Sequence, residues 1–176
     1  MTERSDADLV GAYRAGDESA ATELVRRHAN PLGRYLCGSG ALAADLDDLV
    51  QEAFFRAFSK LETWRGEGSF RGWLYRIGGN LLKDQVRRRR GVVAVPFEDH
   101  DATDGSDPAG DVRANEMEER LVDALGRLPR LQREVFVMRV QLGLEYSEIC
   151  DALGTTPGAA RVHYHHAVKR LKESVQ

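Results

Sequence analysis

The sequence predicts an all-α fold in which a flexible acidic linker, residues 91–112, joins two small helical domains, residues 1–90 and 113–176. Three observations support this prediction. Apolar residues on both sides of the linker recur every three or four positions, which is typical of helices with one buried face. The linker itself is rich in acids, prolines and glycines. The second half also carries the pattern of a helix-turn-helix.

Length and composition limit the possible classes of protein. A chain of 176 residues with 42% hydrophobic and 30% charged residues suits one or two modest cores. No apolar run approaches a membrane span, and residues 1–6 are too polar for a secretion signal. Cys37 and Cys150 fit no paired metal motif and have small or apolar neighbours. We therefore expect buried thiols, a cytoplasmic protein and no membrane contact.

The first clearly amphipathic helix is expected between Asp45 and Leu61. Its buried stripe consists of Leu46, Leu49, Val50, Ala53, Phe54, Ala57, Phe58 and Leu61. The opposite face carries Asp45, Asp48, Gln51, Glu52 and Phe55. An aromatic ring among carboxylates favours docking to a protein partner. The alternative is that the acids only favour the helix dipole and that Phe55 packs under a neighbouring loop.

A second helix is expected from residue 70 to residue 90, with Ser69 as its N-cap. Its apolar stripe contains Phe70, Trp73, Leu74, Ile77 and Leu81. Phe70 and Trp73 are expected to hold the helices together rather than to contact a ligand. The adjacent glycines, Gly78 and Gly79, each cost about 1 kcal/mol relative to alanine in a helix. Close approach of another helix or of DNA is the expected reason.

The polar face of this helix is basic. It presents Arg76, Asn80, Lys83 and Arg87 in one line, and the helix ends in four consecutive arginines, residues 87–90. Cations and an amide in this arrangement can meet phosphates and base edges. The sequence therefore predicts a nucleic-acid surface directly after a protein-docking surface.

The net charge of −3 arises from the linker. Residues 1–90 hold 15 Lys and Arg against 13 Asp and Glu, and residues 113–176 hold 10 against 9. The linker has six acids and no Lys or Arg. A flexible coil of this length spans about 25 Å, so the domains are expected to reach separate sites on one target. Two roles stay open for its charge: a soluble spacer, or an imitation of nucleic acid that masks a basic face.

The C-terminal domain is expected to contain four helices. The first spans about Asn115 to Gly126, and Pro129 suits the first turn of the second. The apolar positions of the second helix are Leu131, Val135, Met138, Val140 and Leu142. The third covers residues 146–153 and ends at Gly154. Thr156 is a natural N-cap for the last helix, which runs from Pro157 to Glu173.

The last helix has the features of a recognition helix. It is expected to bury Ala160, Tyr164, Ala167, Val168 and Leu171 and to expose Arg161, His163, His165, His166, Lys169, Arg170 and Lys172. Pro157, Gly158, Ala159 and Arg161 would then lie nearest the bases. Two alternatives remain open. The three histidines could bind metal, although two spacings place them on different faces, or the helix-turn-helix could only bind protein.

Several motifs in this order resemble the extracytoplasmic-function sigma factors, the small specificity subunits of bacterial RNA polymerase. The motifs are Asp6-Ala7-Asp8-Leu9-Val10, Gly16-Asp17, Ala20 to His28, Asp48-Leu49-Val50-Gln51-Glu52 with Phe54, Phe70-Arg71-Gly72-Trp73-Leu74 with Arg76-Ile77 and Asn80, Leu128-Pro129, Arg133-Glu134-Val135, Tyr146, Glu148-Ile149 and Gly154. The resemblance covers nearly the whole chain. It departs from the family at Ala159, Ala160, Tyr164 and Val168, which leaves the upstream-element preference open.

The resemblance implies specific partners and residues. Core RNA polymerase would meet Asp45, Asp48, Gln51, Glu52 and Phe55 through the clamp helices of its largest subunit, and would also contact the chain through its flap region. Unpaired minus-ten DNA would meet Trp64, Arg65, Ser69, Arg71, Tyr75, Arg76, Asn80, Lys83 and Arg87, with Trp64, Tyr75 and Asn80 receiving flipped bases. The minus-thirty-five duplex would meet Thr156, Pro157, Gly158, Ala159, Arg161, His163, His165, His166, Lys169 and Arg170. An anti-sigma factor is a possible further partner.

Other functional classes fit less well. The chain has no phosphate-cradling P-loop, so promoter opening without ATP and without a cofactor or metal is expected. No nucleophile, paired acid or ligand set converges in the sequence, which argues against an enzyme. The remaining alternative is a one-component transcriptional repressor that binds duplex operator DNA without polymerase.

Overall fold

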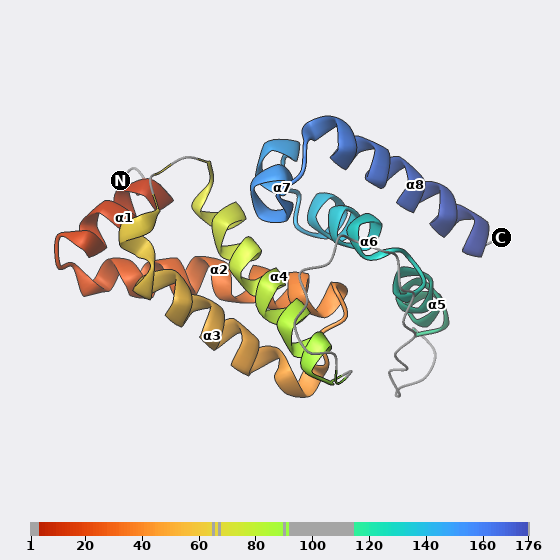
Figure 1. Cartoon of the computed structure of the whole chain (residues 1–176), viewed down its shortest axis with the longest axis horizontal. Helices are drawn as coiled ribbons and strands as arrows, with labels where there is room; N and C mark the ends of the chain where they lie inside the picture. Colours follow the sequence, from red (N-terminus) through yellow and green to blue (C-terminus); the bar gives the residue numbers. More distant parts are fainter. Residues whose placement is uncertain (1–3, 65, 67, 90, 92–114, 176) are drawn as a thin grey trace.

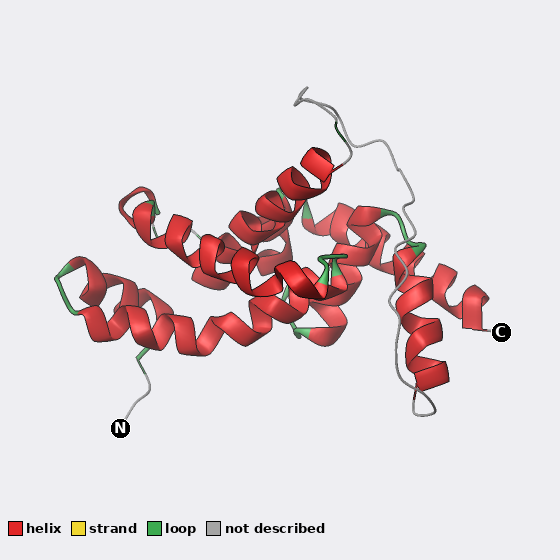
Figure 2. Cartoon of the chain, turned by 90° about the horizontal axis from the view of Figure 1, so that it is seen from below, coloured by secondary structure: helices red, strands yellow, loops and turns green. Residues whose placement is uncertain are grey.

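The computed structural model describes residues 4–64, 66, 68–89, 91 and 115–175. All regular structure in these residues is helical, which confirms the predicted all-α class (Figure 2). The predicted acidic linker lies outside the described residues from residue 92 onward. No helix in the described ranges is long and apolar enough to cross a membrane.

The N-terminal half consists of four α-helices and two short 3-10 turns. The elements are α1 (Asp6–Arg14), α2 (Glu18–Gly38), η1 (Ala43–Asp45), α3 (Leu46–Ser59), η2 (Leu61–Thr63) and α4 (Phe70–Arg89). The C-terminal half consists of α5 (Asn115–Gly126), α6 (Arg130–Phe136), the π-helical turn η3 (Val137–Gln141), α7 (Tyr146–Leu153) and α8 (Pro157–Val175). Figure 1 shows the two halves side by side, with α7 next to α4.

The predicted helix ends are set by local hydrogen bonds. The Ser69 hydroxyl accepts the amide hydrogen of Gly72 at 3.1 Å, and the Thr156 hydroxyl accepts that of Ala159 at 3.2 Å. Each bond satisfies an amide that the first helical turn leaves free, so both residues act as N-caps. Gly154 ends α7 with φ of 65°, a left-handed conformation that glycine adopts without steric cost. The capping predictions are confirmed.

The predicted apolar stripe of α3 lies in the core. Ala53 and Ala57 are fully buried and Leu49 and Phe54 nearly so, while Phe58 is partly buried. Phe70 and Trp73 join an aromatic cluster with Trp64, with ring centroids 6.0 to 6.3 Å apart. Their predicted packing role is confirmed.

The paired glycines of α4 lie against α2. A Cβ atom at Gly78 would stand 2.9 Å from Leu32 Cδ1, and one at Gly79 would stand 2.7 Å from the Tyr35 hydroxyl oxygen. Both distances are below van der Waals contact, so only glycine permits this spacing. Another helix is therefore the reason for the pair.

Three predictions about burial are wrong. Cys37 is exposed and Cys150 only partly buried, because both lie toward the solvent side of their helices. Val140 is 52% exposed, whereas Glu134 is buried. The π-helical turn η3 adds a residue to one turn and shifts which side chains face inward, so a regular helical count fails beyond Phe136.

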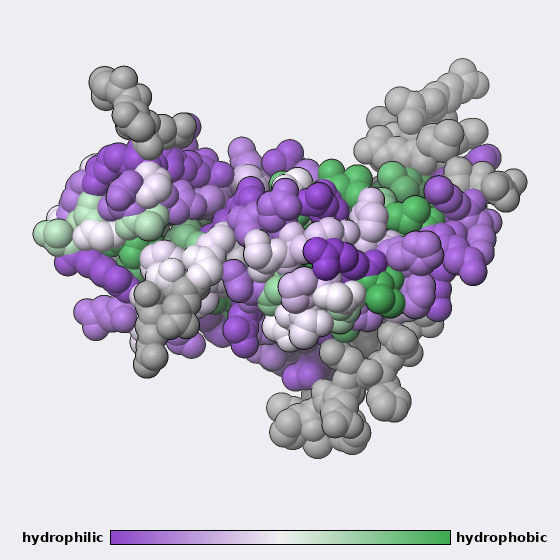
Figure 3. Space-filling model, turned by 90° about the horizontal axis from the view of Figure 1, so that it is seen from above, coloured by the Kyte–Doolittle hydropathy of each residue, from purple (hydrophilic) through white to green (hydrophobic). Residues whose placement is uncertain are grey.

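The two halves share one hydrophobic core. Leu74, Tyr75 and Leu36 from the first half cluster with Ile149, Val137 and Met138 from the second. Helix α4 packs on α7, and α2 packs on α6 and η3. The structure therefore shows the two predicted domains in direct contact. Hydrophilic residues cover most of the face seen in Figure 3, and hydrophobic residues form separate small patches there.

Candidate polymerase and nucleic-acid interface

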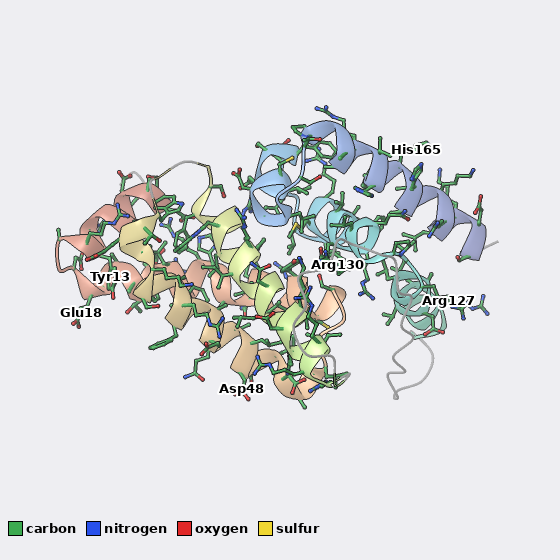
Figure 4. All side chains as sticks on the ribbon, in the orientation of Figure 1. Tyr13, Glu18, Asp48, Arg127, Arg130 and His165 are labelled. Carbon is green, nitrogen blue, oxygen red and sulfur yellow. The ribbon has the colours of Figure 1, made fainter. Side chains whose placement is uncertain are left out.

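The outer face of α3 combines acids with an exposed aromatic ring. Phe55 is 69% exposed, so the alternative that it packs under a loop is wrong. Asp48 and Gln51 are also exposed, and Figure 4 shows Asp48 on the outer side of α3. Two of the acids have basic partners: Asp45 pairs with Arg89, and Glu52 pairs with Arg56 at 2.7 Å. An unpartnered apolar ring within a charged face is suited to protein docking.

The basic line of α4 lies on the surface. Arg76, Asn80 and Arg87 are exposed and Lys83 is half-buried, as their helical spacing predicts. Arg88 and Arg89 extend this positive surface to the end of the helix. This arrangement suits contact with a phosphate backbone.

Trp64 and Tyr75 do not present free ring faces. Tyr75 is fully buried and stacks on Tyr35, with centroids 5.3 Å apart and an interplanar angle of 22°. Burial raises the pKa of Tyr75 to about 12. Trp64 is 8% exposed and packs edge-on against Phe70. The prediction that these rings receive flipped bases is wrong for this structure, because both rings are buried against neighbouring aromatic side chains. Arg65 lies outside the described residues.

Ser69 and Arg71 contact the C-terminal half. The Arg71 guanidinium donates to both carboxylate oxygens of Glu148, at 2.7 and 3.2 Å. The Ser69 hydroxyl donates to Glu148 at 3.0 Å, and the Ser69 amide donates to Asp151 at 3.4 Å. Burial raises the pKa of Glu148, but hydrogen bonds from Arg71, the Glu145 amide and Ser69 outweigh burial and leave this pKa lowered.

Sequence reasoning missed this contact. Glu148 belongs to a motif of the resembled family, but nothing in the sequence pairs it with Arg71, 77 positions earlier. A cavity of about 410 Å³ adjoins the contact, and its walls include His28, Trp64, Ser69, Arg71 and Glu148. The cavity therefore has one wall from the C-terminal half.

Helix α8, the predicted recognition helix, exposes most of the residues that are expected to meet DNA. Arg161, His165, His166, Lys169 and Arg170 are exposed along α8 (Figure 4 labels His165), and His163 is half-buried. The buried side holds Ala160, Ala167 and Leu171. The helix therefore presents a basic, histidine-rich face outward.

Arg161 has an aromatic neighbour in the preceding helix. Its guanidinium carbon lies 5.1 Å from the centroid of the Tyr146 ring, and that of Arg139 lies at the same distance. Arg139 is also anchored to the Leu144 carbonyl at 2.7 Å. Within the described ranges, the histidines of α8 do not gather with other His, Cys, Asp or Glu side chains into a group of three that could hold a metal ion.

An exposed aromatic ring among acids, a basic helix beside it and a helix-turn-helix are the features of a DNA-binding protein that also binds a protein partner. Comparison of the chain with known protein families identifies its family. Sigma-70 region 2 matches residues 24–92, and Sigma-70 region 4 matches residues 118–171. The chain belongs to the extracytoplasmic-function group of the sigma-70 family. It is a transcription initiation factor that directs RNA polymerase to promoters.

Similar proteins extend over nearly the full chain. RNA polymerase sigma factor NccH of Alcaligenes xylosoxydans xylosoxydans is 32% identical over 100% of this chain and 98% of its own length. SigM of Mycobacterium tuberculosis is 32% identical over 96% of this chain and 84% of its own length. The solved structure of CnrH in complex with the cytosolic domain of CnrY is 27% identical, with a TM-score of 0.76 over 98% of this chain and 97% of that one.

Proposed function

We propose that α3 docks the chain on the clamp helices of core RNA polymerase, while α4 holds the minus-ten strand and α8 reads the minus-thirty-five duplex. The observation that carries the docking proposal is the exposed Phe55 ring among Asp48, Gln51 and Glu52. A large ring left in water is stabilised when a partner covers it, and the surrounding acids select a basic partner surface.

Promoter DNA would lie along the basic surface of α4. Arg76, Lys83 and Arg87 would hold phosphates, and Asn80 would meet a base edge. Ser69 and Arg71 would join them at the start of the helix. Opening costs a few kcal/mol per unstacked base, and binding of the separated strand returns a similar amount, so no nucleotide hydrolysis is needed.

The duplex upstream would meet the N-terminal turns of α8. Thr156, Pro157, Gly158 and Ala159 bring backbone close to the groove, and Arg161 offers the strong base contact. His163, His165, His166, Lys169 and Arg170 would follow the phosphates. A flap contact of the polymerase would hold this domain in place.

Further partners and location belong to the same proposal. The similar protein CnrH was solved with the cytosolic domain of CnrY, which supports a regulatory protein partner for this chain as well. We place the activity in the cytoplasm, where RNA polymerase works, without a cofactor and without catalysis by the chain itself.

Run-off transcription with bacterial core polymerase and a promoter library tests the proposal. The wild-type chain should produce transcripts that core polymerase alone does not. The double variant Asp48→Lys, Phe55→Ala should weaken core binding at least about tenfold, because each side chain is a central contact of the proposed interface. Pull-down and biolayer interferometry with core polymerase measure this loss.

Glu62→Lys is the matched control, since Glu62 is also exposed but lies outside the α3 face. Its core affinity should equal that of the wild type. Equal affinity of the double variant and the control would remove α3 from the interface. Duplex binding without any polymerase-dependent transcript would instead support a repressor.

A further inference from the structure

The DNA-facing start of α4 is covered by α7. The Glu148 carboxylate accepts hydrogen bonds from two nitrogens of Arg71 and from the Ser69 hydroxyl, at 2.7 to 3.2 Å. The Asp151 carboxylate accepts a hydrogen bond from the Ser69 amide. Both DNA-binding groups that the proposed function places at this helix end are therefore occupied by acids from the other half of the chain.

The two helices meet with backbone in contact. A Cβ atom at Gly72 would lie 2.9 Å from the Glu148 carbonyl oxygen, and one at Gly68 would lie 2.3 Å from the Asp151 carboxylate. At Gly72 the neighbouring atom is backbone, so a larger residue would force the two helices apart, whereas at Gly68 the Asp151 side chain would have to move. Ile149 and Ala152 of α7 are buried in the same core cluster as Phe70. The close fit shows a specific docking surface on the first half for α7.

The chemistry of the contact matches that of DNA. Arginine binds carboxylates and phosphates with the same two-pronged geometry. A hydroxyl and a free amide at a helix start are also donors that phosphates use. Helix α7 therefore offers Arg71 and Ser69 the same negative oxygens that a DNA strand would bring.

The remainder of the interface contains a charge that favours opening. Glu134 of α6 is 2% exposed, and Arg130 lies 3.1 Å from its carboxylate. Tyr35 of α2, Lys83 of α4 and Arg133 of α6 are the other titratable groups close enough to act on it. Burial raises the pKa of Glu134, although the positive charges of Arg130, Lys83 and Arg133 act in the opposite direction. A buried carboxylate regains hydration when the halves separate, so the closed state is less stable than an apolar interface would make it.

We propose that α7 is an intramolecular competitor of minus-ten DNA, with Glu148 and Asp151 occupying Arg71 and Ser69 until the two halves separate. This inference rests on the proposed function of α4. Its consequence is a lowered apparent affinity: if about nine chains in ten are closed, DNA binds about tenfold more weakly than it binds the open form. Binding of the separated strand and opening of the chain are then linked.

The test removes the competing charges with little change in shape. In the full-length variant Glu148→Gln, Asp151→Asn, the glutamine oxygen still caps the Glu145 amide, which Glu148 accepts at 3.1 Å in the wild type. Small-angle X-ray scattering without ligand should show a larger radius of gyration. Fluorescence anisotropy with a pool of random single-stranded DNA 12-mers should show about tenfold tighter binding.

The matched control is Asp123→Asn, Glu173→Gln, which removes two exposed acids from the same half. It corrects for the general gain in DNA affinity when negative charge is removed. The control should keep the wild-type radius and bind only slightly more tightly. Circular dichroism checks that each variant is folded.

A charge exchange tests the contact itself. Glu148→Arg should expand the chain, because two guanidinium groups then face each other, and Arg71→Glu, Glu148→Arg together should restore the compact radius. Wild-type compactness and control-level DNA affinity of the Gln/Asn variant would overturn the proposal. Expansion of that variant without tighter DNA binding would also overturn the proposal, although this result would leave α4 as the proposed DNA-binding surface. If neither the wild type nor any variant binds single-stranded DNA, even with core polymerase, the proposed function fails.

Discussion

Single side chains in this protein are fixed by partners from distant segments. His28 of α2 lies 2.7 Å from the Asp6 carboxylate of α1, and its ring centroid lies 5.6 Å from that of Phe70 of α4, with the two rings tilted by 55°. Arg27 approaches the same carboxylate at 3.3 Å. These bonds tie the chain start to the helices that carry the candidate site, so the charge of Asp6 contributes to stability.

Asp6→Asn is expected to lower the free energy of unfolding by about 1 kcal/mol at neutral pH, because the half-buried carboxylate is partly screened. Burial raises the pKa of Asp6, but hydrogen bonds and charge from His28 and Arg27 outweigh burial and leave this pKa lowered. The stabilisation is therefore present above the unfolded value, about 3.9, and is lost as the pH falls through the folded value.

Urea denaturation from pH 7 to pH 3 measures this dependence. The difference between the wild type and Asp6→Asn should shrink toward the acid end. Glu62→Gln, at an exposed position, should follow the wild-type curve throughout. A constant difference at every pH would assign the effect of Asp6 to shape rather than charge.

Tyr146 is predicted to position Arg161 for base reading. Tyr146→Leu should weaken binding to a minus-thirty-five duplex about two- to fivefold, the range of an exposed cation–π contact, while Tyr146→Phe should retain the wild-type affinity. Anisotropy with a duplex identified by run-off transcription measures both.

A double-mutant cycle separates positioning from general damage. In an Arg161→Ala background, Tyr146→Leu should have no further effect on DNA affinity. An equal loss in both backgrounds would show that the ring acts independently of Arg161.

At the scale of elements, α4 serves two surfaces at once. Its outer side carries the basic line, and its inner side packs so closely on α2 that only glycine fits at residues 78 and 79. The two glycines lower the intrinsic helix propensity of α4, but they allow it to pack closely on α2. That contact holds the proposed DNA-binding residues on a rigid base.

Gly79→Ala should destabilise the fold by about 1 to 3 kcal/mol, because the new methyl group meets the buried Tyr35 hydroxyl. Gly11→Ala is the control, since a Cβ atom there meets nothing within 4 Å. It should stabilise α1 by about 0.5 to 1 kcal/mol through helix propensity alone. Urea midpoints measure both changes, and a stabilised Gly79→Ala variant would contradict the close-packing explanation.

At the scale of the whole molecule, the contact between the halves extends beyond α7. Gly38 at the end of α2 faces η3, where a Cβ atom would lie 3.0 Å from both methyl groups of Val137. Gly38 is remote from the proposed DNA residues in sequence and belongs to a different helix. It therefore allows the closed state to be disturbed without changing the DNA surface.

Gly38→Leu should expand the chain in solution scattering, leave its helix content unchanged, and tighten binding to single-stranded DNA as the Glu148 and Asp151 variant does. Gly11→Leu, at an open position on α1, provides the control for added side-chain volume. An expanded Gly38→Leu variant with control-level DNA affinity would show that closure and DNA binding are independent.

The helices from α3 to α8, their caps and the polar or apolar character of their faces could be predicted from the sequence alone, whereas α1 and α2 were not predicted as helices. Ser69 and Thr156 cap as predicted, the stripe of α3 is buried, and the basic line of α4 is exposed. These features follow from contacts within a few residues and from helical periodicity, which a sequence displays directly. The motifs were also sufficient to identify the family.

Which helix faces meet depends on tertiary packing. It buried Tyr75 and Trp64, exposed Val140, placed Glu134 inside, and paired Arg71 with Glu148. Helical periodicity separates an apolar side from a polar one, but it does not specify the partner of either side, and a π-helical turn changes the count itself. Contacts between residues far apart in the chain depend on the packing of whole helices, so the closed state of this sigma factor became visible only in three dimensions.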